Sequence, residues 1–121
     1  MKNIELVILQ NLIYNDEFSR KVTPFLKKEY FHDQIEKLVF GAIQDFIATY
    51  NALPTKEAIV IDLDKKTSLT EPQFEELGKL MESLTDEDVP ELDWLSSQTE
   101  DFCKDKAVYN AIMESIHILE D

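Results

Sequence analysis

The chain has 121 residues, of which 44% are hydrophobic, and a formal net charge of -13 from 25 acidic and 12 basic side chains. This hydrophobic content supports one domain with a modest core and excludes a disordered acidic tail. The negative charge disfavours binding to phosphate backbones and to anionic lipid, so we expect basic partners or a role away from nucleic acid.

The first thirty residues are predicted to be helical apart from short turns. Asn3 can cap a helix that runs to about Tyr14 and is apolar on most of its sides, so it should be buried on most sides. A short helix over residues 17–22 should follow it. Thr23-Pro24 then predicts a further helix start, because a capping hydroxyl precedes a proline at the first helical position. The side chains that this helix should carry toward the core are Phe25, Leu26, Tyr30 and Phe31.

Residues 33–50 carry the strongest helical pattern, and we expect the rest of the chain to be arranged around this central helix. Asp33 can cap its start, and Asn51 with Pro54 should end it. Phe40 lies off the apolar stripe, which predicts a second contact surface and a nearly enclosed helix. The residues of the stripe, spaced by three and four, are Ile35, Leu38, Val39, Ala42, Ile43, Phe46, Ile47 and Tyr50.

Two further helices are predicted between residues 55 and 84. Thr55 can cap the first, although its run AIVIDL is β-branched and could also form a strand. We prefer a helix because no second strand is available for pairing. Residues 65–68 should form a polar loop. Thr70 and Gln73 then form a capping box with Pro72 in the first turn. The apolar side chains of that helix are Phe74, Leu77, Leu80, Met81 and Leu84.

An acidic connection over residues 85–88 leads to the last predicted helix, which starts near Asp93 and continues to the end of the chain. About 27 residues at ~1.5 Å each give about 40 Å, whereas a compact domain of this size is about 35 Å across. We therefore expect the far end of this helix to overhang the bundle and to need a partner. The candidate interface residues are Tyr109, Ile112, Met113, Ile116 and Leu119.

Together these elements predict an all-α fold, a small bundle of about six helices. We expect one domain over residues 1–121, with a long helix over residues 93–121. The chain has no apolar run as long as a membrane span, and its start lacks a signal-peptide cleavage region. A single cysteine excludes an internal disulfide and suits a reducing compartment, so the protein is expected to be soluble and intracellular.

The search for chemistry assigns no catalytic, cofactor-binding or metal-binding residue. The two glycines, Gly41 and Gly78, are isolated, whereas a phosphate-binding loop needs several in one turn. His32, His117 and Cys103 are too scattered for a zinc pattern. We interpret the carboxylates as a solvated surface and the aromatic residues as core packing rather than a base-stacking platform. We therefore expect no cofactor and no direct contact with nucleic acid or membrane.

Residues 12–59, LIYNDEFSRKVTPFLKKEYFHDQIEKLVFGAIQDFIATYNALPTKEAI, resemble the amino-terminal domain of DnaB-type replicative DNA helicases, in particular those of T-even-like phages. Residues 93–120 resemble the helix that leads into the helical hairpin of this family. The likeness spans about residues 6 to 120. It is carried by the aromatic pair Tyr30-Phe31, by VFGAI at residues 39–43 in place of an Ile-Phe-x-Ala-type signature, and by the turn Leu53-Pro54-Thr55.

The chain departs from the family in two ways. Many bacterial members carry His where Glu36 stands and Gly near Asn51-Ala52, so this would be a divergent, phage-type version. The sequence also stops before the second helix of the hairpin and before the ATPase domain. The resemblance therefore leaves open whether the chain is an excised domain or a free-standing relative.

The resemblance implies a non-catalytic collar domain of a phage replicative helicase, acting in the cytoplasm of the infected bacterium. In this family the collar domains associate through their helical hairpins in the hexamer and help to contact primase and the helicase loader. We therefore expect self-association into a dimer or ring, with no residue devoted to ATP hydrolysis or strand separation.

Composition also allows a protein of another class. A free-standing acidic phage protein could bind and inhibit a basic host factor by mimicking the charge of DNA. The apolar band at the carboxyl end favours self-association over this alternative, and an enzyme is a distant third possibility.

Overall fold

The computed structural model describes residues 3–87 and 89–120. Two predicted elements include residues outside these ranges: Asp88 belongs to the predicted acidic connection, and Asp121 belongs to the predicted last helix. Within these ranges the chain is all-α, as predicted, and the segment that could have been a strand is helical. The elements are α1 (Ile4–Tyr14), α2 (Asp16–Val22), the 3-10 turn η1 (Lys28–Tyr30), α3 (Gln34–Tyr50), α4 (Lys56–Lys66), α5 (Glu71–Ser83) and α6 (Leu92–Glu120).

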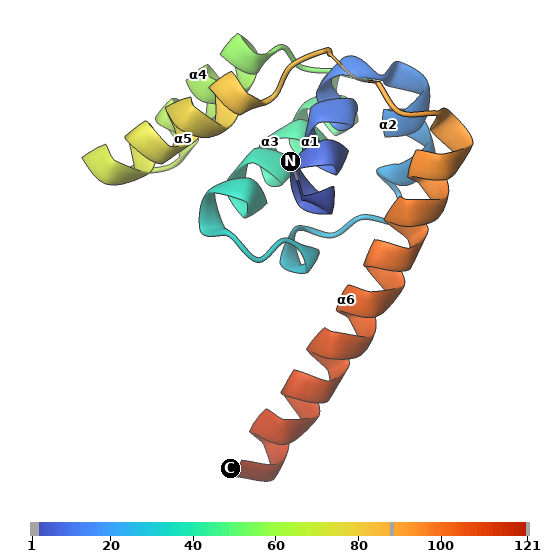
Figure 1. Ribbon diagram of the computed structural model, residues 1–121. Helices are drawn as coiled ribbons and strands as arrows, with labels where there is room; N and C mark the ends of the chain where they lie inside the picture. The colour runs from blue at the N-terminus through green and yellow to red at the C-terminus, as the bar shows by residue number, and fades with distance from the viewer. Residues whose placement is uncertain (1–2, 88, 121) are drawn as a thin grey trace.

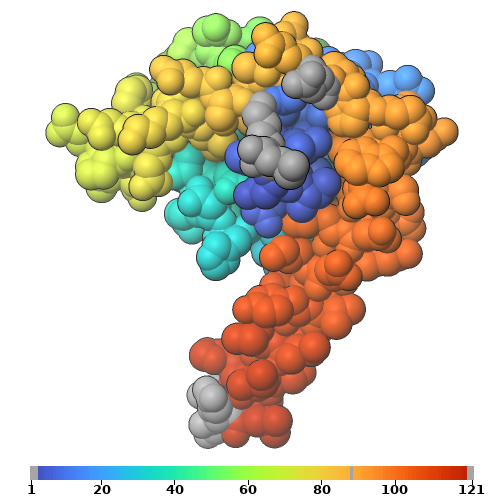
Figure 2. Space-filling model, viewed as in Figure 1, coloured from blue at the N-terminus to red at the C-terminus, as the bar shows by residue number. Residues whose placement is uncertain are grey.

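The helices form a small body from which one long helix projects. α1 and α3 lie at its centre, α2 and the first half of α6 lie on one side, and α4 and α5 lie on the other (Figure 1). The second half of α6 leaves the body as a single helix, and the space-filling view shows it as a free arm (Figure 2). The fold therefore gives one helix two environments, packed at its start and open to solvent toward its end.

Three phenylalanines join the elements of the core. The Phe31 ring stacks on Phe40 of α3 with 5.2 Å between centroids and contacts Phe102 of α6 at 5.8 Å. Phe31 and Phe40 are completely buried. The second contact surface that we predicted from Phe40 is therefore present, because this side of α3 faces the chain segment that runs from η1 into α3.

The helix starts follow the predicted capping chemistry. The Asp33 carboxylate accepts hydrogen bonds from the backbone N–H groups of Ile35 and Glu36, at 3.0 and 3.1 Å, so it satisfies two donors that the first turn of α3 leaves free. α3 ends at Asn51, whose φ of 52° is in the left-handed region that asparagine tolerates well. The caps confirmed in this way are Asn3, Asp33, Thr55 and Thr70, the last in a complete capping box.

The prediction that Thr23-Pro24 starts a helix is wrong. Thr23 instead ends α2: it keeps helical backbone angles, and its hydroxyl donates to the carbonyl of Ser19 rather than capping a new helix. A turn follows, closed by the Phe25 N–H on the Val22 carbonyl at 2.9 Å. This turn directs Phe25 outward, where 66% of it is exposed, while Leu26 reaches the core with Tyr30 and Phe31.

The core is also smaller than the apolar pattern suggested. α3 is enclosed only as far as Ile43, and Tyr50 is exposed, with its ring on Phe46 at 4.7 Å. Burial on α5 begins at Leu77, so Phe74 lies outside as well. α4 continues to Lys66, into the segment predicted as a loop. In α3 and α5 the predicted face is correct, but neighbouring helices cover only part of its length.

Candidate protein-interaction surface

α6 is 29 residues long, about 43 Å at the usual rise per residue. The Glu91 carboxylate accepts hydrogen bonds from the Asp93 and Trp94 N–H groups at 3.2 and 3.1 Å, so it caps the first turn. The following turns pack on α1, α2 and η1. Asn110 makes a further contact with the body, through its side-chain amide, which donates to the Glu29 carbonyl at 3.3 Å. From residue 111 to residue 119 every side chain is exposed.

The exposed end of α6 carries an apolar face, which we call the α6 stripe. Its exposed fractions range from 43% to 85%. The spacing of three and four places its members on one side of the helix. The stripe continues a seven-residue spacing from the packed part of α6. Leu95 and Phe102 are buried in the body, and Tyr109 and Ile116 follow them at the same spacing. The α6 stripe consists of the predicted interface residues Tyr109, Ile112, Met113, Ile116 and Leu119.

Lys106 links the buried and exposed parts of α6. Its ammonium lies 6.0 Å from the centroid of the Phe102 ring and 5.9 Å from that of the Tyr109 ring. Such cation–π contacts contribute about 0.5–1 kcal/mol at exposed sites. The Tyr109 ring is therefore held at the point where the α6 stripe leaves the body.

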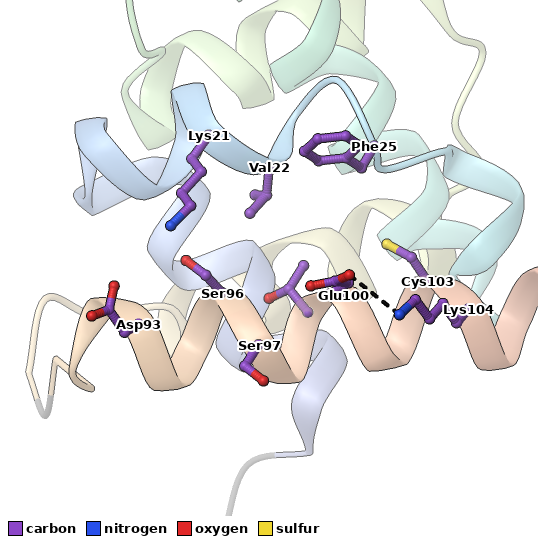
Figure 3. A pocket seen from close by; sticks show the side chains of 10 residues that line it. Lys21, Val22, Phe25, Asp93, Ser96, Ser97, Glu100, Cys103 and Lys104 are labelled. Atoms are coloured by element: carbon purple, nitrogen blue, oxygen red, sulfur yellow. Dashed lines mark ion pairs between the residues drawn. The ribbon is translucent and has the colours of Figure 1, made fainter.

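A second feature lies on the opposite side of α6, in a groove between this helix, α2 and the turn that follows α2. The groove has a volume of about 610 Å³. Lys21, Val22 and Phe25 face Ser96 and Cys103 of α6 across it (Figure 3). Sequence reasoning missed this groove because it assigned Phe25 to the core. The available signal was the proline directly before Phe25, which marks a turn as readily as a helix start.

Comparison with known proteins shows what the chain is similar to. No protein-family model matches the chain. Over 113 residues, or 93% of its length, the chain is 30% identical to a DnaB-like replicative helicase of Enterobacteria phage T4. The chain is similar to part of a phage replicative helicase. The resemblance inferred from the sequence is thereby confirmed. The match covers 23% of the helicase, so the chain spans about a quarter of the length of that relative.

Within this helicase-related fold, Glu36 is an unusual carboxyl group. Partial burial, the charge of Glu5 on α1 and the charge of Asp33 together raise its pKa from the ordinary 4.5 to about 7. Its Oε1 atom is buried and has no hydrogen-bond partner among the described residues. Glu36 stands in the first turn of α3, where the helix dipole favours a negative charge, but the sequence gives no sign that two further carboxylates lie close to it.

A change of Glu36 to Gln should alter how stability depends on pH. A carboxyl group with a raised pKa binds more protons in the folded than in the unfolded state between pH 4.5 and about 7. Stability should therefore fall as pH rises through that window. Because Glu36 is partly solvated, we expect Glu36→Gln to add only about 1 kcal/mol at pH 8 and nothing at pH 4. Urea unfolding at both pH values measures this, and parallel pH profiles for the two proteins would contradict it.

The described residues give no support for metal binding or for a reactive cysteine. In the described part of the chain, no three His, Cys, Asp or Glu side chains come together as a metal site would require. Burial and the neighbouring charge of Glu100 raise the pKa of the Cys103 thiol, so it is a weaker nucleophile than a free cysteine. Over the same residues, none of the helices is both long and apolar enough to span a membrane. The α6 stripe and the groove are thus the features that call for a functional explanation.

Proposed function

We propose that the chain is the non-catalytic amino-terminal domain of a phage replicative DNA helicase, acting in the cytoplasm of the infected bacterium. In this role it mediates association between helicase subunits and docks primase and the helicase loader. The observation that carries the proposal is the α6 stripe, an apolar face on a helix that has left the body of a helicase-related domain. Large apolar side chains gathered on one exposed face usually mark a contact surface.

The α6 stripe is large enough to support association. Fully burying a side chain of this kind contributes about 1.5–3 kcal/mol, so five of them offer up to about 8–15 kcal/mol from each copy, against a cost of about 4–15 kcal/mol for bringing two chains together. A second copy is a suitable partner because the stripe is self-complementary: it is apolar along its whole length and can pair with itself about a two-fold axis.

The remaining surface supports the docking role. With a net charge of -13, the domain repels phosphate backbones and attracts basic protein surfaces. The three ion pairs found among the described residues are local contacts within single helices, so they leave this overall field unchanged. We therefore propose protein partners, rather than DNA, for the acidic body.

Ile116→Asp tests the role of the α6 stripe. The change places a carboxylate in the apolar contact, where it loses hydration without gaining a partner. We expect the dissociation constant for self-association to rise at least tenfold, because the contact loses about 1.5–3 kcal/mol of apolar burial. Size-exclusion chromatography with light scattering, over a range of protein concentrations, measures this change.

Ile118→Asp is the matched control. Ile118 stands two residues away, about 200° around the helix, and is 68% exposed. This variant should retain the mass of the unchanged protein. Both variants should keep their helix content and main thermal transition. Equal loss of association in both, or unfolding of the Ile116→Asp variant alone, would show that the stripe is not the interface.

A further inference from the structure

We propose that the exposed end of α6, residues 111–119, forms and melts separately from the body, and that pairing of the α6 stripe with a second copy stabilises its helix. We call these residues the arm. The inference rests on the proposed subunit association and adds how that association is controlled. Four of the five stripe residues lie in the arm, so helix formation in the arm sets the strength of the contact.

The body does not hold the arm in place. Every side chain of the arm is exposed, and the arm leaves the molecule as a single helix (Figure 2). The last side-chain hydrogen bond between α6 and the described body comes one residue earlier, where the Asn110 amide donates to the Glu29 carbonyl at 3.3 Å. Segments with few buried contacts open at a low cost in free energy, independently of the rest of the fold. The arm is such a segment.

Interactions within the arm add little to its stability. The Ser115 hydroxyl donates to the Ala111 carbonyl at 3.0 Å, a kind of bond that slightly destabilises helices. The three ion pairs found among the described residues lie elsewhere, on α2, on α4 and in the first half of α6. Three positions of the arm carry isoleucine, which forms helices less readily than alanine or leucine: Ile112, Ile116 and Ile118. The arm therefore lacks the side-chain pairs that usually stabilise an exposed helix.

The arm can still form its helix for part of the time. The preceding turns of α6 pack on the body and supply the helix nucleus, so the arm only has to extend it. Extension is close to balanced for ordinary residues in water, which gives a mixture of helical and open arms. Because the stripe residues gather on one side only in a helix, a second copy binds the helical arm and shifts the mixture toward it. The dissociation constant then depends on the fraction of arms that are helical.

Hydrogen exchange at two protein concentrations tests the separate melting. In the dilute monomer, amides of the arm should exchange within about tenfold of the unfolded rate, whereas amides between Leu95 and Phe102 stay strongly protected. At a concentration where light scattering shows association, protection of the arm should rise about tenfold or more, and protection of the body should not change. Arm amides as protected as those of the body in the dilute monomer would overturn the inference.

Ala111→Gly weakens the helix of the arm without altering the stripe. Ala111 is exposed and stands about 140° around the helix from Ile116. Glycine lowers the helical equilibrium at one position about fourfold to fivefold relative to alanine. Both copies carry the change, so the dissociation constant for self-association should rise about fourfold or more. Ala48→Gly, the same change at an exposed position of α3, should leave it as it is.

The results separate this inference from the proposed association. If Ile116→Asp weakens self-association and Ala111→Gly does not, the stripe is the interface and the arm is fully helical before it binds, so only the separate melting is contradicted. If the chain stays monomeric at every concentration, the association is contradicted, and the coupling of the arm to a second copy with it. In that case, hydrogen exchange of the monomer still decides whether the arm melts separately.

Discussion

Phe31→Ala is expected to destabilise the domain by about 3–5 kcal/mol, the range typical for loss of a buried phenylalanine. Phe31 is completely buried and contacts the rings of both Phe40 and Phe102. Its removal leaves a cavity where η1, α3 and α6 meet, and it breaks the aromatic contacts that fix α6 on the body. Since small domains have a total stability of about 5–15 kcal/mol, a large part of the stability should be lost.

Urea unfolding followed by circular dichroism measures this effect, and Phe25→Ala is the matched control. Phe25 lies six residues earlier, on the surface, so its removal should change the free energy of unfolding by less than about 0.5 kcal/mol. If the two variants lose similar stability, Phe25 belongs to the core and the assignment of the turn after α2 is wrong.

These two phenylalanines also show how far the sequence could predict the fold. Phe31 was assigned to the core as part of the helix predicted from Thr23-Pro24, and Phe40 because it lies off the apolar stripe of residues 33–50 and so indicates a second contact surface. Phe25 was assigned to the same core and lies outside. Thr23-Pro24 fits a helix start and a turn equally well, and the choice depends on how α2 ends, which is a tertiary effect.

The candidate interaction surface, too, could be predicted from the sequence only in part. The exposed end of α6 could be expected from the sequence, because helix length and domain diameter both follow from residue number. The groove could not, because it is formed by two segments about 75 residues apart, and no local pattern indicates that Phe25 and Cys103 line the same groove from opposite sides. Similarly, the raised pKa of Glu36 depends first on its partial burial in the folded domain and then on the charge of Glu5, a residue of another helix.

A buried hydrogen-bonding side chain in α1 gives the second large effect. Gln10 is 5% exposed, and its Oε1 accepts from the Thr85 N–H at 3.0 Å while its Nε2 donates to the Glu87 carbonyl at 3.3 Å. These bonds tie α1 to the connection that leads into α6. The apolar pattern of α1 predicted its burial on most sides, but nothing in the pattern indicated a polar bridge to residues about 75 positions away.

Gln10→Leu keeps the approximate size of the side chain but leaves the Thr85 N–H and the Glu87 carbonyl without their partner. Losing a partner costs about 1–3 kcal/mol when the remaining group is shielded from water. Glu87 is exposed, so its carbonyl can bind water instead, and we expect the total loss of stability to stay within the range for one group. The measurement is again urea unfolding, with Gln44→Leu, at an exposed position on α3, as the control.

Hydrogen exchange adds a local test: the Thr85 amide should exchange faster in Gln10→Leu, while amides in the centre of α3 keep their relative protection. If Gln10→Leu is as stable as Gln44→Leu, the bridge does not hold the connection, and the packing of α6 on α1 and α2 must position it alone.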